Sequence, residues 1–165
     1  MKRMGFAAVT AAGVALLLAG LAFGGGAAVG AKKPKVKGTK VTAALTPKQE
    51  VPRQTYAVPR AYGRFNGVIS KVSATYKLQW SLSFHKLSGT PMAAHIHIGR
   101  PGSNGKIVVL LCQAKTIKPC GLATGGLLKL TPALVRALTH RDAYVNVHTR
   151  RNPNGEIRGT IVVTK

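Results

Sequence analysis

The chain has 165 residues, and its 25 lysines and arginines outnumber three acidic residues to give a formal net charge of +22. This length suits one domain and excludes two sizeable ones. The positive charge attracts polyanions such as cell-wall phosphate, acidic polysaccharide or anionic lipid headgroups, but it specifies no fold. With only Glu50, Asp142 and Glu156 as carboxylates, the composition argues against general acid–base catalysis.

Residues 1–31 have the pattern of a secretory signal peptide. Two basic residues open the segment, an apolar stretch runs from about Gly5 to Phe23, and small residues complete it. We expect cleavage after Ala31 or, as a second site, after Ala28. An uncleaved membrane anchor is the alternative, because about 20 apolar residues span a bilayer. Either outcome predicts a secreted, periplasmic or envelope-associated protein.

A dense basic run, KKPKVKGTK, covers residues 32–40. We expect a flexible linker here that lies along an anionic surface. The other basic residues are scattered and the aromatic residues are few, so no platform for stacked bases is visible. The expected partner is therefore an anionic envelope polymer or a protein, and dedicated nucleic-acid binding is not expected.

Strand patterns recur at regular intervals from residue 40 onwards. Residues 40–45 alternate in polarity, and three prolines within 46–60 then predict a loop, because proline cannot serve a central strand. Two further strands are predicted over 61–70 and 72–84. In the second, every other residue from Ala74 to Phe84 is apolar, which indicates one buried face.

Two β-hairpins are predicted in the second half of the chain. The first joins residues 92–99 to 106–111 through RPGSNG, and the second joins 143–149 to 156–163 through RRNPNG. Glycine and asparagine supply the positive φ angles of such turns, and Pro153 presets one turn residue.

One helix is predicted over about 131–139, where Thr131 suits the N-cap and Pro132 the first helical position. Seven or eight strands with one short helix predict an all-β fold, with two antiparallel sheets in an immunoglobulin-like or Greek-key sandwich. In an oxidising compartment Cys112 and Cys120 are expected to form a disulfide. A pair of soft metal ligands is the alternative.

Three histidines form a candidate metal site. Residues two apart in a strand project to one face, so His95 and His97 lie side by side. His148 joins them if the two hairpins are neighbours, and three imidazoles suit copper or zinc. Alternatively, the ring nitrogens form hydrogen bonds to backbone carbonyls or to a carboxylate such as Glu156. The three histidines then have only a structural role in the sandwich. His85 and His140 match no such pattern.

The second hairpin adds a predicted structural polar cluster of Glu156, Arg158 and Asn146. Within it, Arg151 lies opposite Glu156, and we expect an exposed cross-strand ion pair between them. No catalytic residue is predicted, because the chain has no GxSxG motif and no phosphate-binding glycine loop.

The motifs AHIH, VHT and NPNGEIRG follow one another in the order found in the CHRD domain, the repeat first described in chordin. The sequence resembles that domain over about Val41 to Thr164. The matching positions are His95, His97, His148, Asn152, Pro153, Gly155, Glu156, Arg158 and Gly159. The resemblance implies a secreted sandwich over 41–165, of the kind found as repeats in the animal growth-factor antagonist and as single domains in bacteria. It implies no enzyme, and antagonism is not transferred, since the cysteine-rich von Willebrand modules are absent.

HIHIG is also similar to the copper-ligand strand of copper/zinc superoxide dismutase. The histidine cluster and aspartate of the zinc loop do not follow, so dismutase activity is not expected. We therefore expect a monomeric, exported, non-enzymatic binding or structural protein of the envelope. Copper or zinc binding through His95, His97 and His148 is the alternative.

Overall fold

The computed structural model describes residues 38–114, 120, 121 and 123–164. The predicted signal peptide and most of the predicted linker lie outside the described residues. Strand pairing begins at Thr39, so the last two residues assigned to the linker belong to the first strand. Within the described ranges, no helix is long and apolar enough to cross a membrane.

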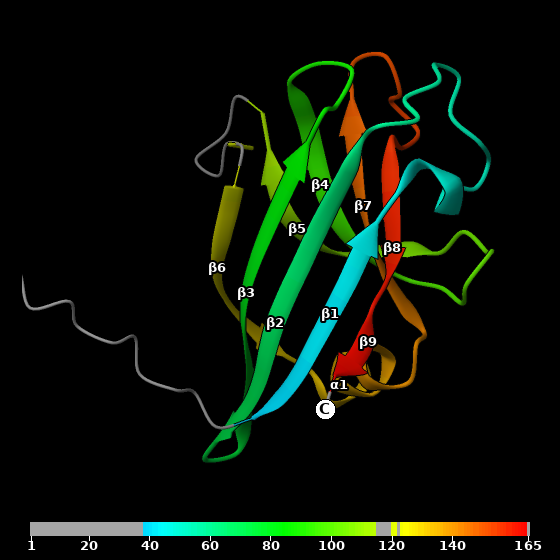
Figure 1. Ribbon diagram of the computed structural model, residues 1–165. Helices are drawn as coiled ribbons and strands as arrows, with labels where there is room; N and C mark the ends of the chain where they lie inside the picture. Colours follow the sequence, from blue (N-terminus) through cyan, green and yellow to red (C-terminus); the bar gives the residue numbers. More distant parts are fainter. Residues whose placement is uncertain (1–37, 115–119, 122, 165) are drawn as a thin grey trace, which may run out of the picture. The chain divides into compact units, whose positions relative to one another are not determined.

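Nine strands, one short 3-10 helix and one α-helix make up the described part of the chain (Figure 1). They are β1 Thr39–Leu45, η1 Pro47–Gln49, β2 Tyr62–Val72, β3 Thr75–His85, β4 Pro91–Ile98, β5 Lys106–Gln113, β6 Ala123–Leu130, α1 Pro132–Thr139, β7 Ala143–Thr149, β8 Ile157–Thr160 and β9 Val162–Thr164.

The strands form two antiparallel sheets, as the sequence predicts. One sheet has the order β6-β3-β2-β1-β9 and the other β5-β4-β7-β8. In Figure 1 the five-stranded sheet stands in front of the second. The last strand is interrupted at Ile161, so that β8 pairs with β7 in one sheet and β9 pairs with β1 in the other. The predicted all-β sandwich is confirmed.

Alternating side chains of both sheets fill the core between them. On β3, Leu78, Trp80, Leu82 and Phe84 are buried as predicted, whereas Ala74 lies exposed in the turn before the strand. On β4 and β7 of the second sheet, Ala94, Ile96, Val145 and Val147 are buried members of the apolar core. Because side chains alternate along a strand, the histidines between these positions face away from the core.

The predicted helix and disulfide are both present. Thr131 caps α1 by accepting a hydrogen bond from the backbone N–H of Leu134 at 3.2 Å, and Cys112 is bonded to Cys120. Strand β6 has no clear sequence signal, since glycines weaken a strand pattern. Gly125 is nevertheless required there, because an added Cβ would lie 2.8 Å from the carbonyl oxygen of Trp80.

Candidate metal centre

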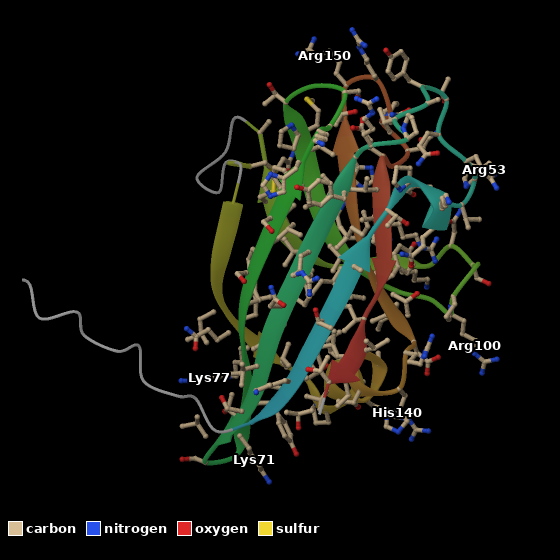
Figure 2. The ribbon with its side chains drawn as sticks, viewed as in Figure 1. Arg53, Lys71, Lys77, Arg100, His140 and Arg150 are labelled. Carbon is tan, nitrogen blue, oxygen red and sulfur yellow. A yellow bond between two sulfur atoms is a disulfide. The ribbon has the colours of Figure 1, made fainter. Side chains whose placement is uncertain are left out.

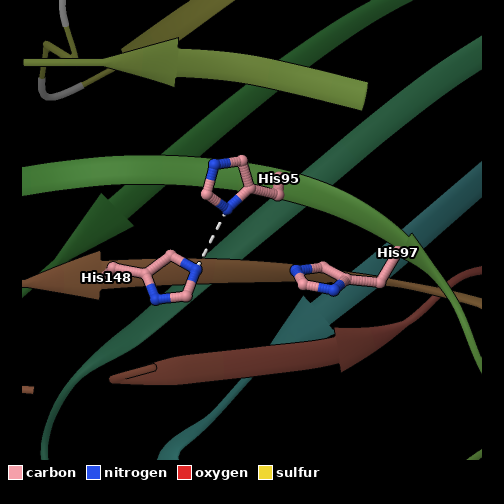
Figure 3. A group of neighbouring side chains, drawn as sticks. All are labelled: His95, His97 and His148. Carbon is pink, nitrogen blue, oxygen red and sulfur yellow. Dashed lines mark hydrogen bonds between the residues drawn. The ribbon is translucent and has the colours of Figure 1, made fainter. Parts of the chain in front are cut away.

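The two hairpins are neighbours in one sheet, which brings the three histidines together. His95 and His97 lie on β4, His148 lies on the adjacent β7, and one ligand nitrogen from each falls within 4.8 Å of the others (Figure 3). Nδ1 of His95 lies 3.1 Å from Nε2 of His148. The structure thus assembles the trio proposed from the sequence.

Backbone carbonyls determine which nitrogens of the trio carry hydrogen. Nδ1 of His97 donates to the carbonyl of Gly105 at 3.0 Å, and Nδ1 of His148 donates to that of Pro153 at 2.9 Å. In a neutral imidazole, the other nitrogen then holds a free lone pair. Nε2 of His148 accepts from His95, whereas the buried Nε2 of His97 has no hydrogen-bond partner among the described residues.

Burial also keeps these imidazoles neutral. It lowers the pKa of His95 to about 4, and the rings of His148 and His97 lower this pKa further. Burial likewise lowers the pKa of His97 and of His148, although their bonds to carbonyls act in the opposite direction. At neutral pH each ring therefore keeps one lone pair, as metal binding requires. For Nδ1 of His95 to face an ion together with Nε2 of His148, His95 must carry its hydrogen on Nε2, and the hydrogen bond between the two rings is replaced.

The spacing of the trio is slightly wider than a loaded site requires. Metal–nitrogen bonds of about 2.0–2.1 Å in a tetrahedral site place ligand nitrogens about 3.4 Å apart. The His95–His148 pair is already this close at 3.1 Å, and the full spread of 4.8 Å means that His97 must approach the other two rings when an ion binds. Three protein ligands leave a fourth coordination position for water or another ligand.

A stack of side chains supports His97 from beside the trio. The ring of Tyr144 lies 4.6 Å from that of His97 at an interplanar angle of 10°, and the Arg158 guanidinium lies 3.5 Å from the Tyr144 centroid. Arg158 also donates to the carbonyl of Ser103 at 2.6 Å, in the loop that ends at Gly105. Arg158 therefore holds in place the loop whose carbonyl orients His97.

Glu156 is fully buried and belongs to a different set of contacts. It accepts hydrogen bonds from the backbone N–H and hydroxyl of Ser88, from the Thr149 hydroxyl and from the Asn152 amide. The predicted Arg151–Glu156 ion pair is wrong, because Glu156 points inward to these donors. Arg151 instead lies over the ring of Tyr56, 4.7 Å from its centroid.

Asn146 pairs with Glu50, a carboxylate that no local sequence pattern marks as part of a site. Its amide donates to both oxygens of Glu50, at 3.0 and 2.9 Å. Glu50 follows η1 in the proline-rich loop, where no alternating pattern predicts burial, and only the scarcity of acidic residues marks it. Asn146 and Arg158 are cross-strand neighbours. The members of the predicted polar cluster nevertheless do not bond to one another: Asn146 bonds to Glu50, Arg158 to Ser103 and Glu156 to Ser88.

Burial raises the pKa of Glu50 to about 8, against the opposing effects of Arg158 and the Asn146 hydrogen bond, while Glu156 raises it further. Gly155, at a φ of +139°, packs against this pair. A Cβ at Gly155 would lie 2.5 Å from Oε2 of Glu50 and 2.6 Å from Nδ2 of Asn146. The NPNG turn thus closes over a carboxyl group whose pKa burial raises.

Comparison with known proteins finds one family. The model of the CHRD domain matches residues 41–161, a range that holds the three histidines, both cysteines and all three carboxylates. The comparisons with curated proteins and with solved structures find no match.

Replacing Glu156 by glutamine should lower the free energy of unfolding by about 2–4 kcal/mol, because the amide leaves buried donors of Ser88, Thr149 and Asn152 without an acceptor. Urea unfolding at pH 7 measures the change. Asp142→Asn is the control, since its 3.8 Å ion pair with Arg100 is partly exposed and should contribute less than about 1 kcal/mol. Equal losses in the two variants would contradict the role given to Glu156.

Glu50→Gln should remove a pH dependence of stability. Because the folded-state pKa of Glu50 lies above its ordinary 4.5, its stabilising contribution is complete below that pH and is lost as pH rises towards 8. Above pH 8 the variant should therefore exceed the wild type in unfolding free energy by up to about 5 kcal/mol, and the two should converge near pH 5. Urea unfolding of both proteins from pH 5 to 9 measures the difference in unfolding free energy. A difference that did not change with pH would contradict the raised pKa of Glu50.

Proposed function

This chain belongs to the CHRD domain family, and we propose that it is an exported, non-enzymatic protein that binds a copper or zinc ion through His95, His97 and His148. One observation carries the proposal. Nε2 of His97 is buried beside two other imidazoles and has no hydrogen-bond partner in the described part of the chain. A buried polar atom without a partner costs about 1–3 kcal/mol, and a metal ion at this position would satisfy it.

The hydrogen bonds around the trio also favour metal binding. Histidines that bind metals usually donate their other ring nitrogen to a carbonyl or carboxylate, which sets the tautomer and the orientation of the ring. His97 and His148 both do so, through Gly105 and Pro153. If the three histidines had only a structural role, we would expect each ring nitrogen to have a hydrogen-bond partner. Nε2 of His97 has none among the described residues.

The chemistry of the ligand set narrows the choice of ion. Imidazole nitrogen suits copper and zinc, whereas calcium and magnesium require oxygen ligands. Glu50 and Glu156 bind Asn146 and the Ser88 loop, and Asp142 faces Arg100. Each carboxylate of the chain thus has another partner, which supports the choice of a nitrogen-bound ion and a role without general acid–base catalysis.

A second candidate function concerns the charge of the chain. We propose that the exported domain is held at an anionic polymer of the envelope. Among the described residues the single ion pair is Arg100–Asp142, so most cationic groups remain without an acidic partner. Figure 2 shows labelled basic side chains at several edges of the domain, among them Arg53, Lys77 and Arg150.

Metal titration tests the first proposal. The mature domain, purified without a polyhistidine tag, should bind one copper or zinc ion per chain in calorimetry and melt at a higher temperature when loaded. His97→Ala and His148→Ala should each weaken binding at least about 100-fold, since loss of a ligand costs more than loss of an outer partner. His140→Ala, at an exposed position away from the trio, should bind like the wild type.

Two results would reject metal binding. One is the absence of a complex at one ion per chain, and the other is equal weakening in the His140→Ala control. If the histidines only support the sandwich, their alanine variants should melt earlier in chelator, and added metal should leave the wild-type melting temperature unchanged.

Salt dependence tests the second candidate. Binding to an acidic polysaccharide such as polygalacturonate should weaken at least about tenfold between about 50 and 200 mM salt, because exposed charges are screened within about a Debye length. Sedimentation with the insoluble polymer measures the bound fraction. Binding that does not respond to salt would exclude the electrostatic attraction.

A further inference from the structure

A hollow of about 580 Å³ lies at the end of the sandwich where β7 turns back towards β8. Its lining includes Ser88, Gly89 and Thr90 from the connection between β3 and β4, and Arg150 and Arg151 from the turn after β7. Figure 2 places Arg150 at the opposite end of the domain from Lys71. The hollow therefore lies far from the hairpin that joins β2 to β3.

Both arginines of the hollow lack an acidic partner within the described residues. Glu156 is bonded to Ser88, which lines the hollow, but its carboxylate is buried. It already accepts hydrogen bonds from Ser88, Thr149 and Asn152. Guanidinium groups present planar forks of donors that match a carboxylate or a phosphate. The hollow thus offers two guanidinium groups without an acidic partner among the described residues, and Glu156 below them is already bound to other donors.

An exposed aromatic ring stands beside these arginines. Tyr56 is 46% exposed, and the Arg151 guanidinium lies 4.7 Å from its ring centroid. Asn152 holds the Tyr56 backbone with two hydrogen bonds, accepting from its N–H at 2.8 Å and donating to its carbonyl at 3.0 Å. The backbone of Tyr56 is therefore fixed, and its ring lies against the Arg151 guanidinium, an arrangement that lowers the entropy cost of binding a ligand there.

We propose that this hollow is a binding site for an acidic glycan. A carboxylate or phosphate on the sugar would meet Arg150 and Arg151, the apolar face of a sugar ring would pack on Tyr56, and the hydroxyl of Thr90 would face the sugar hydroxyls. The inference rests on the proposed attraction to an anionic envelope polymer and gives that attraction a specific contact point. A diffuse positive surface alone would not distinguish this end of the domain from any other.

The first test compares two double variants that lose the same charge. Arg150→Gln/Arg151→Gln removes two cations from the hollow, and Lys71→Gln/Lys77→Gln removes two from elsewhere in the domain. Calorimetry with polygalacturonate oligomers in about 0.15 M salt should show a loss of at least about tenfold for the arginine variant, and less than about threefold for the lysine control. Equal losses in the two variants would overturn the site and leave the diffuse attraction.

A second test blocks the hollow without changing the charge. A Cβ at Gly89 would meet no atom within 4 Å, so Gly89→Gln should fold normally and place its side chain in the hollow. We expect an unchanged melting temperature and binding several-fold weaker. Tyr56→Ala should likewise weaken binding, through loss of the stacking surface. Full binding by both variants would overturn the proposed site.

The choice of probe separates the remaining outcomes. Phosphomannan distinguishes a phosphate-bearing sugar from the carboxylate of polygalacturonate, and neutral dextran should not bind. If DNA bound as tightly as the glycans and depended on the same arginines, specificity for sugars would be wrong. If the wild type bound no anionic polymer even at low salt, the proposed attraction to polyanions would be wrong. Equal losses in the two charge-matched variants would instead reject only the site in the hollow.

Discussion

The pairing of β4 with β7 is the constraint on which the rest of the structure depends. In this register His95 pairs with Asn146, and His148 pairs with Ala93, two residues further along each strand. A shift of one residue along either strand would turn its histidines towards the core and its valines or isoleucine outwards. Burial of Ile96, Val145 and Val147 opposes that shift. Apolar packing on one face therefore specifies the position of the polar groups on the other.

The outer face of this sheet is unusual because much of it is buried and polar. The loop between β4 and β5 covers Tyr144 through its bonds to Arg158, and the proline-rich loop covers Asn146 through Glu50. Burying polar groups is costly unless each finds a partner. Among the described residues, two side-chain atoms of this face are buried without a partner, Nε2 of His97 and Oδ1 of Asn146. Of the two, only Nε2 of His97 belongs to the histidine trio.

Local sequence patterns predict most of the fold and part of the site. Alternation predicts β3, and turn residues predict both hairpins, because these signals act between residues close in the chain. Glu50 and Asn146 are 96 positions apart, and no short-range pattern predicts their contact. For Glu156, cross-strand position alone predicts an exposed ion pair with Arg151. Its true partner Ser88 comes from a distant loop that only the packed structure places beside it.

The turn after β7 connects the two proposed sites. The carbonyl of Pro153 orients His148 in the trio, and two residues earlier in the same turn Arg151 lies against Tyr56 at the hollow. Between them Asn152 bonds both to Glu156 and to the Tyr56 backbone. One buried carboxylate thus supports a turn that faces the metal trio on one side and the arginine hollow on the other. Two positions of the run from Asn152 to Glu156 are restricted by their contacts. Gly155 must lack a side chain, because a Cβ there would meet Glu50 and Asn146, and the side chain of Glu156 must point inward to Ser88, Thr149 and Asn152.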